Sequence, residues 1–229
     1  MTTILAIETS TELASAALLV DGQMHSRELS GVQTHSQGIL PALQSLLSEA
    51  GIALSECDAL AFGCGPGAFT GIRTACGIVQ GLAYGAELNV VPVVSLRAMA
   101  LAALTEAKAD NLICVLDARM SEVYWAQYRF VEGVCEELSP PVLAKIDDIL
   151  PRADQGIPCF VLGTGVILPS RFSQYPSISL MPHARQVAEL GSQALVNKQD
   201  VPAELAQPLY LRNKIALTTV ERNLVQGQK

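Results

Sequence analysis

The sequence predicts an α/β protein built from two similar halves that divide near residue 108. Both halves open with an apolar strand that runs into an acidic residue: residues 3–7 lead to Glu8, and residues 111–116 lead to Asp117. In the first half, helical patterns and short apolar strands then alternate. Half of the 229 residues are hydrophobic and only 16% are charged, so the chain is able to bury a large core.

The first half is expected to hold a three-stranded meander followed by alternating helices and strands. Residues 3–7 are apolar on both faces, as in a central strand covered on both sides. A strand over 13–20 follows, and Asp21-Gly22 is a hairpin signal before a polar third strand over 23–29. The remaining expected elements are helix 35–50, which contains Pro41 and so has a kink or a later start, strand 58–63, helix 70–87, strand 89–94, and a helix capped by Ser95 that reaches residue 106.

The second half repeats this opening and then becomes rich in loops. A strand over 111–116 is expected to pair with an alternating strand over 122–130. The next stretch is rich in proline, which predicts irregular structure around a strand at 159–162 and a helix at 183–198. We therefore expect a first lobe over residues 1–107 and a second, degenerate lobe with a tail over residues 108–229.

The charge of the chain argues against nucleic-acid binding by this chain alone. The net charge is −7, and the 15 Lys and Arg residues are scattered, whereas a nucleic-acid-binding protein is expected to show a basic patch. The first twenty residues hold Glu8 and Glu12 and lack the basic segment of a signal peptide. No stretch reaches the roughly 20 apolar residues of a membrane helix, so we expect a cytoplasmic protein without membrane contact.

The sequence contains no recognisable pattern of a metal site or a hydrolase. His25, His35 and His183 lie far apart, and none has a second histidine four positions on, as a zinc-binding H-x-x-x-H helix requires. The six cysteines include no C-x-x-C pair and mostly lie in apolar runs, which predicts reduced, buried thiols. There is no G-x-S-x-G motif. We predict no metal and no catalytic residue, although distant residues can still meet in the fold.

Residues 63–68 match the G-x-G-x-x-G/A dinucleotide fingerprint in letters but not in context. That fingerprint follows the first strand of a βαβ unit and has an acidic residue about 20 positions later, at the end of the next strand. Here it follows a fourth strand, and the nearest acidic residue, Glu87, precedes the next strand. No Gly-Lys-Ser/Thr of a P-loop follows either. We interpret this loop as structural, with nucleotide binding as the alternative.

Gly77, Gly81 and Gly85 recur every four residues and so form one stripe along the helix after this loop. Each glycine inside a helix costs about 1 kcal/mol relative to alanine, a large loss for a fold with a total stability of about 5–15 kcal/mol. A glycine stripe lets another backbone approach closely. From the residues alone the neighbour is either the chain's own core, which is slightly favoured, or another subunit. The apolar helix over 35–50 is expected to share this surface.

The two acidic turns stand at equivalent places in the two halves. Glu8-Thr9-Ser10 and Asp117, facing each other across a cleft, would suit a divalent metal and a triphosphate. Gly163 and Gly165, after the strand at 159–162, would supply a further contact on the base side. The alternative is that the acidic residues are two solvated strand ends and that the glycines form a plain turn.

Four segments together resemble the bacterial TsaB (YeaZ) family: ILAIETST at 4–11, GPGAFTGIR at 65–73, DARMSEVY at 117–124 and YLRN at 210–213. They occur in the family's order and span nearly the whole chain. The resemblance implies the actin-like/Hsp70-like ATPase (ASKHA) fold, with two lobes of βββαβαβα type. It also implies a role in making N6-threonylcarbamoyladenosine (t6A) at position 37 of tRNAs that read ANN codons, as a non-catalytic paralogue of the transferase TsaD.

The resemblance further implies partners and a docking surface. TsaD pairs with this subunit through helices of the first lobe, the ATPase TsaE joins the pair, and TsaB alone forms homodimers; tRNA is reached only through the complex, and no cofactor is implied. The expected interface residues are His35, Ile39, Leu43, Leu46, Thr70, Arg73, Thr74, Gly77, Gly81 and Gly85. The expected vestigial nucleotide site consists of Glu8, Thr9, Ser10, Asp117, Arg119, Gly163 and Gly165.

Two departures from related enzymes indicate an inactive paralogue. TsaD-type enzymes carry an H-x-x-x-H metal pair on the helix that aligns with His35, and here the residue four positions on is Ile39. The second phosphate turn of the superfamily usually has glycine soon after its aspartate, whereas Ala118 and Arg119 follow Asp117 here. A residual nucleotide-binding ATPase is the alternative function, and a peptidase, suggested by the family's old glycoprotease-like label, comes third.

Overall fold

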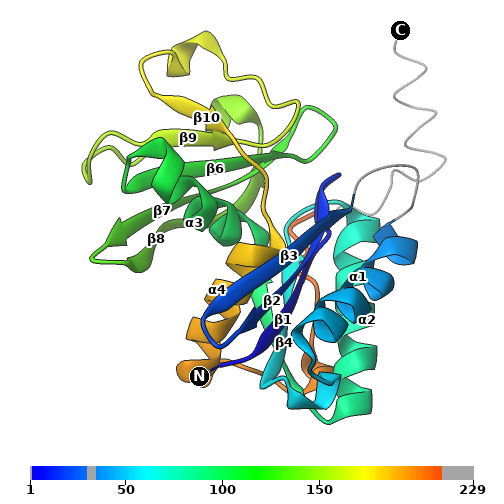
Figure 1. Cartoon of the computed structure of the whole chain (residues 1–229). Helices are drawn as coiled ribbons and strands as arrows, with labels where there is room; N and C mark the ends of the chain where they lie inside the picture. Colours follow the sequence, from blue (N-terminus) through cyan, green and yellow to red (C-terminus); the bar gives the residue numbers. More distant parts are fainter. Residues whose placement is uncertain (1, 30–34, 213–229) are drawn as a thin grey trace, which may run out of the picture.

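The computed structural model describes residues 2–29 and 35–212 and shows two lobes, each built on a five-stranded sheet (Figure 1). The first sheet has the order β3-β2-β1-β4-β5 and consists of β1 (Ile4–Glu8), β2 (Ala14–Val20), β3 (Gln23–Leu29), β4 (Ala59–Gly65) and β5 (Asn89–Val94). All five residues of β1 are buried, and β1 pairs antiparallel with β2 and parallel with β4. The predicted meander and its central first strand are confirmed.

The second sheet repeats the topology of the first. Read from β8 its order is β8-β7-β6-β9-β10, made of β6 (Asn111–Asp117), β7 (Val123–Val131), β8 (Val134–Ala144), β9 (Cys159–Leu162) and β10 (Ser177–Ser179). β6 pairs antiparallel with β7 and parallel with β9, as β1 does with β2 and β4. This duplication is the actin-like fold. The second lobe is degenerate, because the 3₁₀ helices Ile146–Asp148 and Ser170–Phe172 stand where the first lobe has α1 and α2.

Strand β8 was not expected, because its segment contains Pro140 and Pro141. It forms the edge of the second sheet, and the two prolines fall where the pairing with β7 is irregular, between the pairs Ser139–Gln127 and Val142–Trp125. Proline is tolerated at an edge or a bulge because no ladder hydrogen bond is required there. The short edge strand β10 was not expected either.

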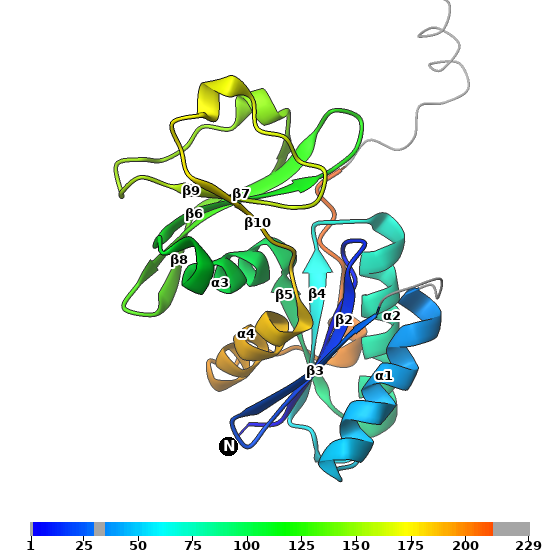
Figure 2. The ribbon, with the colours of Figure 1, turned by 45° about the horizontal axis from the view of Figure 1, so that its top comes forward.

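Three helices enclose the first sheet. α1 (His35–Ala50) and α2 (Phe69–Ala86) lie side by side on one face, and α4 (Ala184–Val196) covers the other (Figures 1 and 2). α1 begins at His35 in spite of Pro41, so the later start is not observed. Two further 3₁₀ helices, Leu54–Glu56 and Ala203–Leu205, complete this lobe. Within the described residues no helix is long and apolar enough to cross a membrane.

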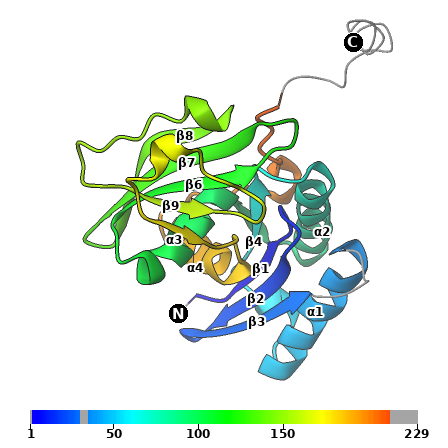
Figure 3. The same ribbon diagram turned by 90° about the horizontal axis from the view of Figure 1, so that it is seen from above.

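Helix α3 (Ser95–Ala107) lies between α4 and the second sheet (Figures 2 and 3). It is apolar on several sides: Ala98 packs into the core of the first lobe, while Met99 and Ala100 pack into that of the second. Val94 occupies its N-cap position, so the predicted cap at Ser95 is wrong. A division at residue 107 separates the two sheets but not the helices, because α4 follows the second sheet in the chain and packs on the first.

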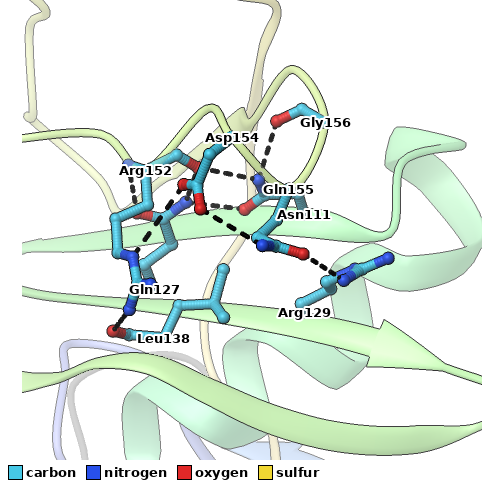
Figure 4. Close-up of polar contacts among 8 residues, drawn as sticks. All are labelled: Asn111, Gln127, Arg129, Leu138, Arg152, Asp154, Gln155 and Gly156. Atoms are coloured by element: carbon cyan, nitrogen blue, oxygen red, sulfur yellow. Dashed lines mark hydrogen bonds and ion pairs between the residues drawn. The ribbon is translucent and has the colours of Figure 1, made fainter.

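A polar cluster holds the loop after β8 against the second sheet (Figure 4). The buried Gln127 amide nitrogen donates to Asn111 Oδ1 at 2.7 Å and to the Arg152 carbonyl at 2.8 Å, and Gln127 Oε1 accepts from the Arg152 N–H at 2.9 Å. Asn111 also donates to the carbonyl of Gly156 at 2.8 Å. Since these buried polar groups are bonded to one another, we assign the cluster a structural role.

Candidate functional site

A cavity of about 1460 Å³ lies between the two lobes. It is lined by the turn after β1, the start of α2, the turn between β6 and β7, the turn after β9 with Met181, and the C-terminal segment 209–212. Of the predicted nucleotide-site residues, the cavity brings together Ser10, Asp117, Arg119 and Gly165. Asp117 lines this cavity between the lobes, whereas Glu8 of the other acidic turn does not.

Glu8 lies behind the wall of this cavity and not in it. Its side chain is fully buried, with the Ser10 N–H donating to Oε1 at 2.6 Å and the Ser95 hydroxyl donating to Oε2 at 2.8 Å. Burial raises the pKa of the Glu8 carboxyl, and the bonds from Ser10 and Ser95 oppose this in part. A carboxylate enclosed in this way does not reach a metal or phosphate in the cavity.

The glycine-rich segment 63–71 packs closely against the Glu8–Ser10 turn. A Cβ on Gly63 would stand 1.9 Å from Glu8 Oε2, one on Gly67 would stand 2.3 Å from the Ser10 carbonyl oxygen, and one on Gly71 would stand 1.9 Å from the Thr9 carbonyl oxygen. The Thr9 hydroxyl donates to the Gly71 carbonyl at 2.8 Å. These glycines are therefore required for close packing inside the chain, Gly63 against the Glu8 side chain and Gly67 and Gly71 against backbone.

The Asp117 turn is open and strained. The Arg119 N–H donates to Asp117 Oδ1 at 2.9 Å, and the Arg119 guanidinium lies 3.2 Å from Asp117 Oδ2. Arg119, Met120 and Ser121 have φ values of 63°, 56° and 60°. Each left-handed residue other than glycine costs of order 1–3 kcal/mol. The approach to Asp117 is thus occupied by the chain's own arginine.

Gly163 and Gly165, predicted to contact the base side of a nucleotide, lie in different surroundings. Gly163 is buried, and a Cβ there would stand 2.6 Å from a methyl carbon of Leu116. Gly165 has a φ of 79° and lines the cavity. Gly163 is thus a packing residue, and only Gly165 reaches the proposed site.

Three predicted interface residues on α1 are in the core. Ile39, Leu43 and Leu46 are buried in the cluster that joins α1, α2 and the first sheet. In this fold they cannot contact a partner directly, so their assignment to the interface is wrong. Their helical spacing does mark one apolar face, and the sheet covers it. His35 begins α1.

The predicted residues on α2 are at the surface. Gly77, Gly81 and Gly85 are exposed, and a Cβ on any of them would meet nothing within 4 Å. Thr70 and Arg73 are also exposed, and the partly buried Thr74 hydroxyl donates to the Thr70 carbonyl at 2.9 Å. The internal-packing alternative for the glycine stripe is therefore excluded for the described chain.

Sequence reasoning overlooked two aromatic residues on the same helix. Phe69 is 59% exposed and Tyr84 is 78% exposed, near opposite ends of α2. The Arg73 guanidinium carbon lies 3.4 Å from the centre of the Phe69 ring. Aromatic and arginine side chains are enriched at protein interfaces. The sequence could have identified both residues by their helical spacing from Gly77, Gly81 and Gly85.

The part of the chain that the structure describes contains neither a cluster of metal-binding side chains nor a thiol with a lowered pKa among those whose pKa is shifted. Within residues 2–29 and 35–212 no group of three or more His, Cys, Asp or Glu side chains is placed to hold a metal ion. All six cysteines are free, and five are buried. Burial raises the pKa of the Cys64 thiol to about 12 and that of the Cys57 thiol to about 11.

The chain is similar to known proteins over most of its length. Residues 17–158 match the family model described as TsaD, tRNA N6-adenosine threonylcarbamoyltransferase. The chain is 38% identical to the tRNA threonylcarbamoyladenosine biosynthesis protein TsaB of Haemophilus influenzae, over 93% of this chain and 94% of that one. It is 35% identical to the Escherichia coli protein of the same name, over 93% and 96%. The solved structure of YeaZ from Pseudomonas aeruginosa superposes with a TM-score of 0.82 at 36% identity, covering 92% of this chain and all of that one. The chain belongs to the TsaB (YeaZ) family.

Proposed function

We propose that this chain is a non-catalytic subunit of the cytoplasmic machinery that makes t6A on tRNA, and that it binds TsaD through the exposed face of α2. One observation carries the proposal: Gly77, Gly81 and Gly85 stand on the surface with nothing of the described chain above them. In this proposal TsaE joins the TsaB–TsaD pair, tRNA is held through the complex, and the chain forms a homodimer when TsaD is absent.

The energetic cost of the stripe supports a partner. Glycines inside a helix destabilise it by about 1 kcal/mol each relative to alanine, and here no internal contact of the described chain offsets that loss. A glycine surface allows a second helix to approach closely, while Phe69 and Tyr84 offer large apolar areas beside the stripe. Small residues flanked by exposed aromatics are a suitable surface for a helix of another subunit.

The state of the two acidic turns supports the non-catalytic half of the proposal. Glu8 is enclosed, and the Arg119 side chain pairs with Asp117. Neither turn presents a free carboxylate in the arrangement that holds a metal and phosphates. The net charge of −7 supports tRNA binding by a partner, because phosphate contacts require positive charge.

The proposal is tested with Gly81→Leu, a bulky residue in the middle of the stripe, and with Gln193→Leu on the exposed side of α4 as the matched control. Both variants should fold, as judged by circular dichroism and thermal melting. We expect Gly81→Leu to lose co-purification with TsaD and to abolish t6A formation in the reconstituted system, while Gln193→Leu retains both. Full binding and activity in Gly81→Leu would contradict the placement of the interface.

A second candidate, residual nucleotide binding, is favoured by the size of the interlobe cavity, which Ser10, Asp117 and Arg119 line. Calorimetry with Mg-ATP on the isolated chain tests it. Absence of heat at millimolar nucleotide removes this candidate. Heat that disappears in Asp117→Asn would support it.

A further inference from the structure

The C-terminal segment joins the hydrophobic cores of the two lobes. Leu209 packs against the cluster of the first lobe, and its N–H donates to the Cys64 carbonyl in β4 at 2.8 Å. Two residues later, Leu211 packs against the cluster of the second lobe. Residues 209–212 all line the interlobe cavity, and the segment leaves the first lobe toward the second (orange in Figures 2 and 3). We call residues 209–212 the strap.

Arg212 fastens the strap to the strained turn of the second lobe. Its Nη2 lies 2.9 Å from Glu122 Oε2 and donates to the Ala118 carbonyl at 2.8 Å and to the Arg119 carbonyl at 3.4 Å. An arginine fork that binds several acceptors at once fixes geometry as well as contributing energy. Three successive left-handed residues persist only where their surroundings hold them, and Arg212 supplies such a hold.

Tyr210, the second residue of the strap, contacts α2. The Arg73 Nε–H donates to the Tyr210 hydroxyl at 2.7 Å, and the Tyr210 ring centre lies 6.1 Å from that of Phe69. Arg73 and Phe69 both belong to the exposed face of α2. A continuous set of contacts therefore runs from α2 through the strap to the turn at 119–121.

We propose that the strap sets the width of the interlobe cleft and couples the exposed face of α2 to the turn at Arg119–Ser121. A partner that engages Arg73 or Phe69 shifts Tyr210, and through Arg212 this shift changes the hold on the turn. The coupling to a partner depends on the proposed function, whereas the role in the isolated chain does not. The strap thus makes the second lobe sensitive to what binds the first.

The role of the strap without a partner is tested on the isolated chain. Arg212→Met keeps the length of the side chain and removes its donors; Arg171→Met is the matched control, since Arg171 also holds a carboxylate and a carbonyl, those of Asp147 and Ile149, but within one lobe. Amide exchange followed by NMR should become at least tenfold faster at Ala118 and Glu122 in Arg212→Met only, with an increased radius of gyration in small-angle scattering. Exchange within twofold of the wild type would overturn the proposal.

A second, milder variant distinguishes a local effect at the turn from misfolding of the chain. Tyr210→Phe removes only the hydroxyl that Arg73 contacts. Exchange in β1 and β4 reports whether the fold is intact. We expect faster exchange at the turn in Tyr210→Phe, by a smaller factor than in Arg212→Met. Exchange at the turn equal to that of the wild type would contradict a role for the contact between Tyr210 and Arg73.

Addition of TsaD tests the coupling. We expect TsaD to slow exchange in α2 and to change exchange at Ala118 and Glu122 in the wild type, and to change only α2 in Arg212→Met. If TsaD protects α2 and leaves the wild-type turn unchanged, the coupling is wrong and the proposed function stands. If TsaD protects nothing, the proposed function fails, and the result for the isolated chain is unaffected.

Discussion

Two sets of glycines with the same four-residue spacing follow one another along the chain: Gly63, Gly67 and Gly71, then Gly77, Gly81 and Gly85. In the first set, a Cβ would stand between 1.9 and 2.3 Å from atoms of the Glu8–Ser10 turn. In the second set, a Cβ would meet nothing within 4 Å. The first set therefore has an internal reason for being glycine, and the second has none inside the described chain.

This contrast separates two uses of one residue. The first set lets the loop before α2 close over the Glu8 turn, so it contributes to the stability of the fold. The second set lowers the stability of α2 and leaves an open surface. A residue that costs stability without an internal contact indicates a contact outside the chain, which is why the α2 face carries the proposed function.

The largest effect is expected at Gly71. Gly71→Ala places a methyl group 1.9 Å from the Thr9 carbonyl oxygen, a backbone atom that cannot move aside cheaply. We expect a loss of about 3 kcal/mol or more in the free energy of unfolding. Urea titration measures it, with Gly77→Ala as the control. A loss below about 0.5 kcal/mol, the range of ordinary surface substitutions, would show that the loop relaxes and would weaken the comparison.

The opposite sign is expected for the second set. The double variant Gly77→Ala/Gly81→Ala removes two helix-interior glycines with open space above them. The isolated chain should become more stable by about 2 kcal/mol, at roughly 1 kcal/mol for each position. Thermal and urea unfolding measure the gain. Destabilisation of the isolated chain would reveal an internal contact for the stripe and break the comparison.

A smaller effect concerns the Glu8 carboxyl, against which Gly63 packs. Because burial raises the pKa of Glu8 above its ordinary 4.5, the folded chain binds this proton more tightly than the unfolded chain. Its stabilising contribution is present below pH 4.5 and is lost as pH rises through the raised pKa. Glu8→Gln removes this titration, so its stability should fall less than that of the wild type as the pH rises above 4.5.

Urea unfolding at several pH values checks this, with Glu204→Gln, an exposed carboxylate, as the control. The control should follow the wild-type pH dependence. Identical pH profiles for wild type and Glu8→Gln would mean that the Glu8 turn is open to solvent, and the seal formed by Gly63 would then be disproved.

The smallest effect on stability is expected at Tyr84. Tyr84→Ser changes a side chain that is 78% exposed, so the free energy of unfolding should stay within about 0.5 kcal/mol of the wild type. Binding to TsaD should weaken nevertheless, because the aromatic side chain belongs to the proposed docking face. Pull-down with TsaD measures binding, and unchanged affinity would restrict the interface to the glycines.

The local elements were predictable because each depends on neighbours in sequence. Strands β3 and β5 and helix α1 have the expected bounds, since alternating or helical patterns and turn residues mark them. β8 was overlooked because its two prolines are acceptable only at an edge, and the edge is set by its pairing with β7. Ser95 resembles a helix cap, and its role as a partner of Glu8 depends on a contact across 87 positions.

The candidate site was predictable in part. The two acidic turns were found from their equivalent positions, but the burial of Glu8 depends on Gly63, which lies 55 positions away. Ile39, Leu43 and Leu46 were assigned to a partner surface because a periodic pattern identifies an apolar face without identifying what covers it. The sequence identified the strap only as part of a family motif. Its contacts with Arg73 and Glu122 could not be predicted, because they join distant parts of the chain.

The sequence by itself determined the duplicated α/β architecture, the four family segments and the presence of a costly glycine stripe, because these are properties of local pattern and composition. The tertiary structure alone decided which way the stripe faces, because the direction of a helix face depends on the sheet and on α1, which are distant in sequence. Of the two sets of glycines with the same four-residue spacing, it assigned the first to the interior of the chain and the second to its surface.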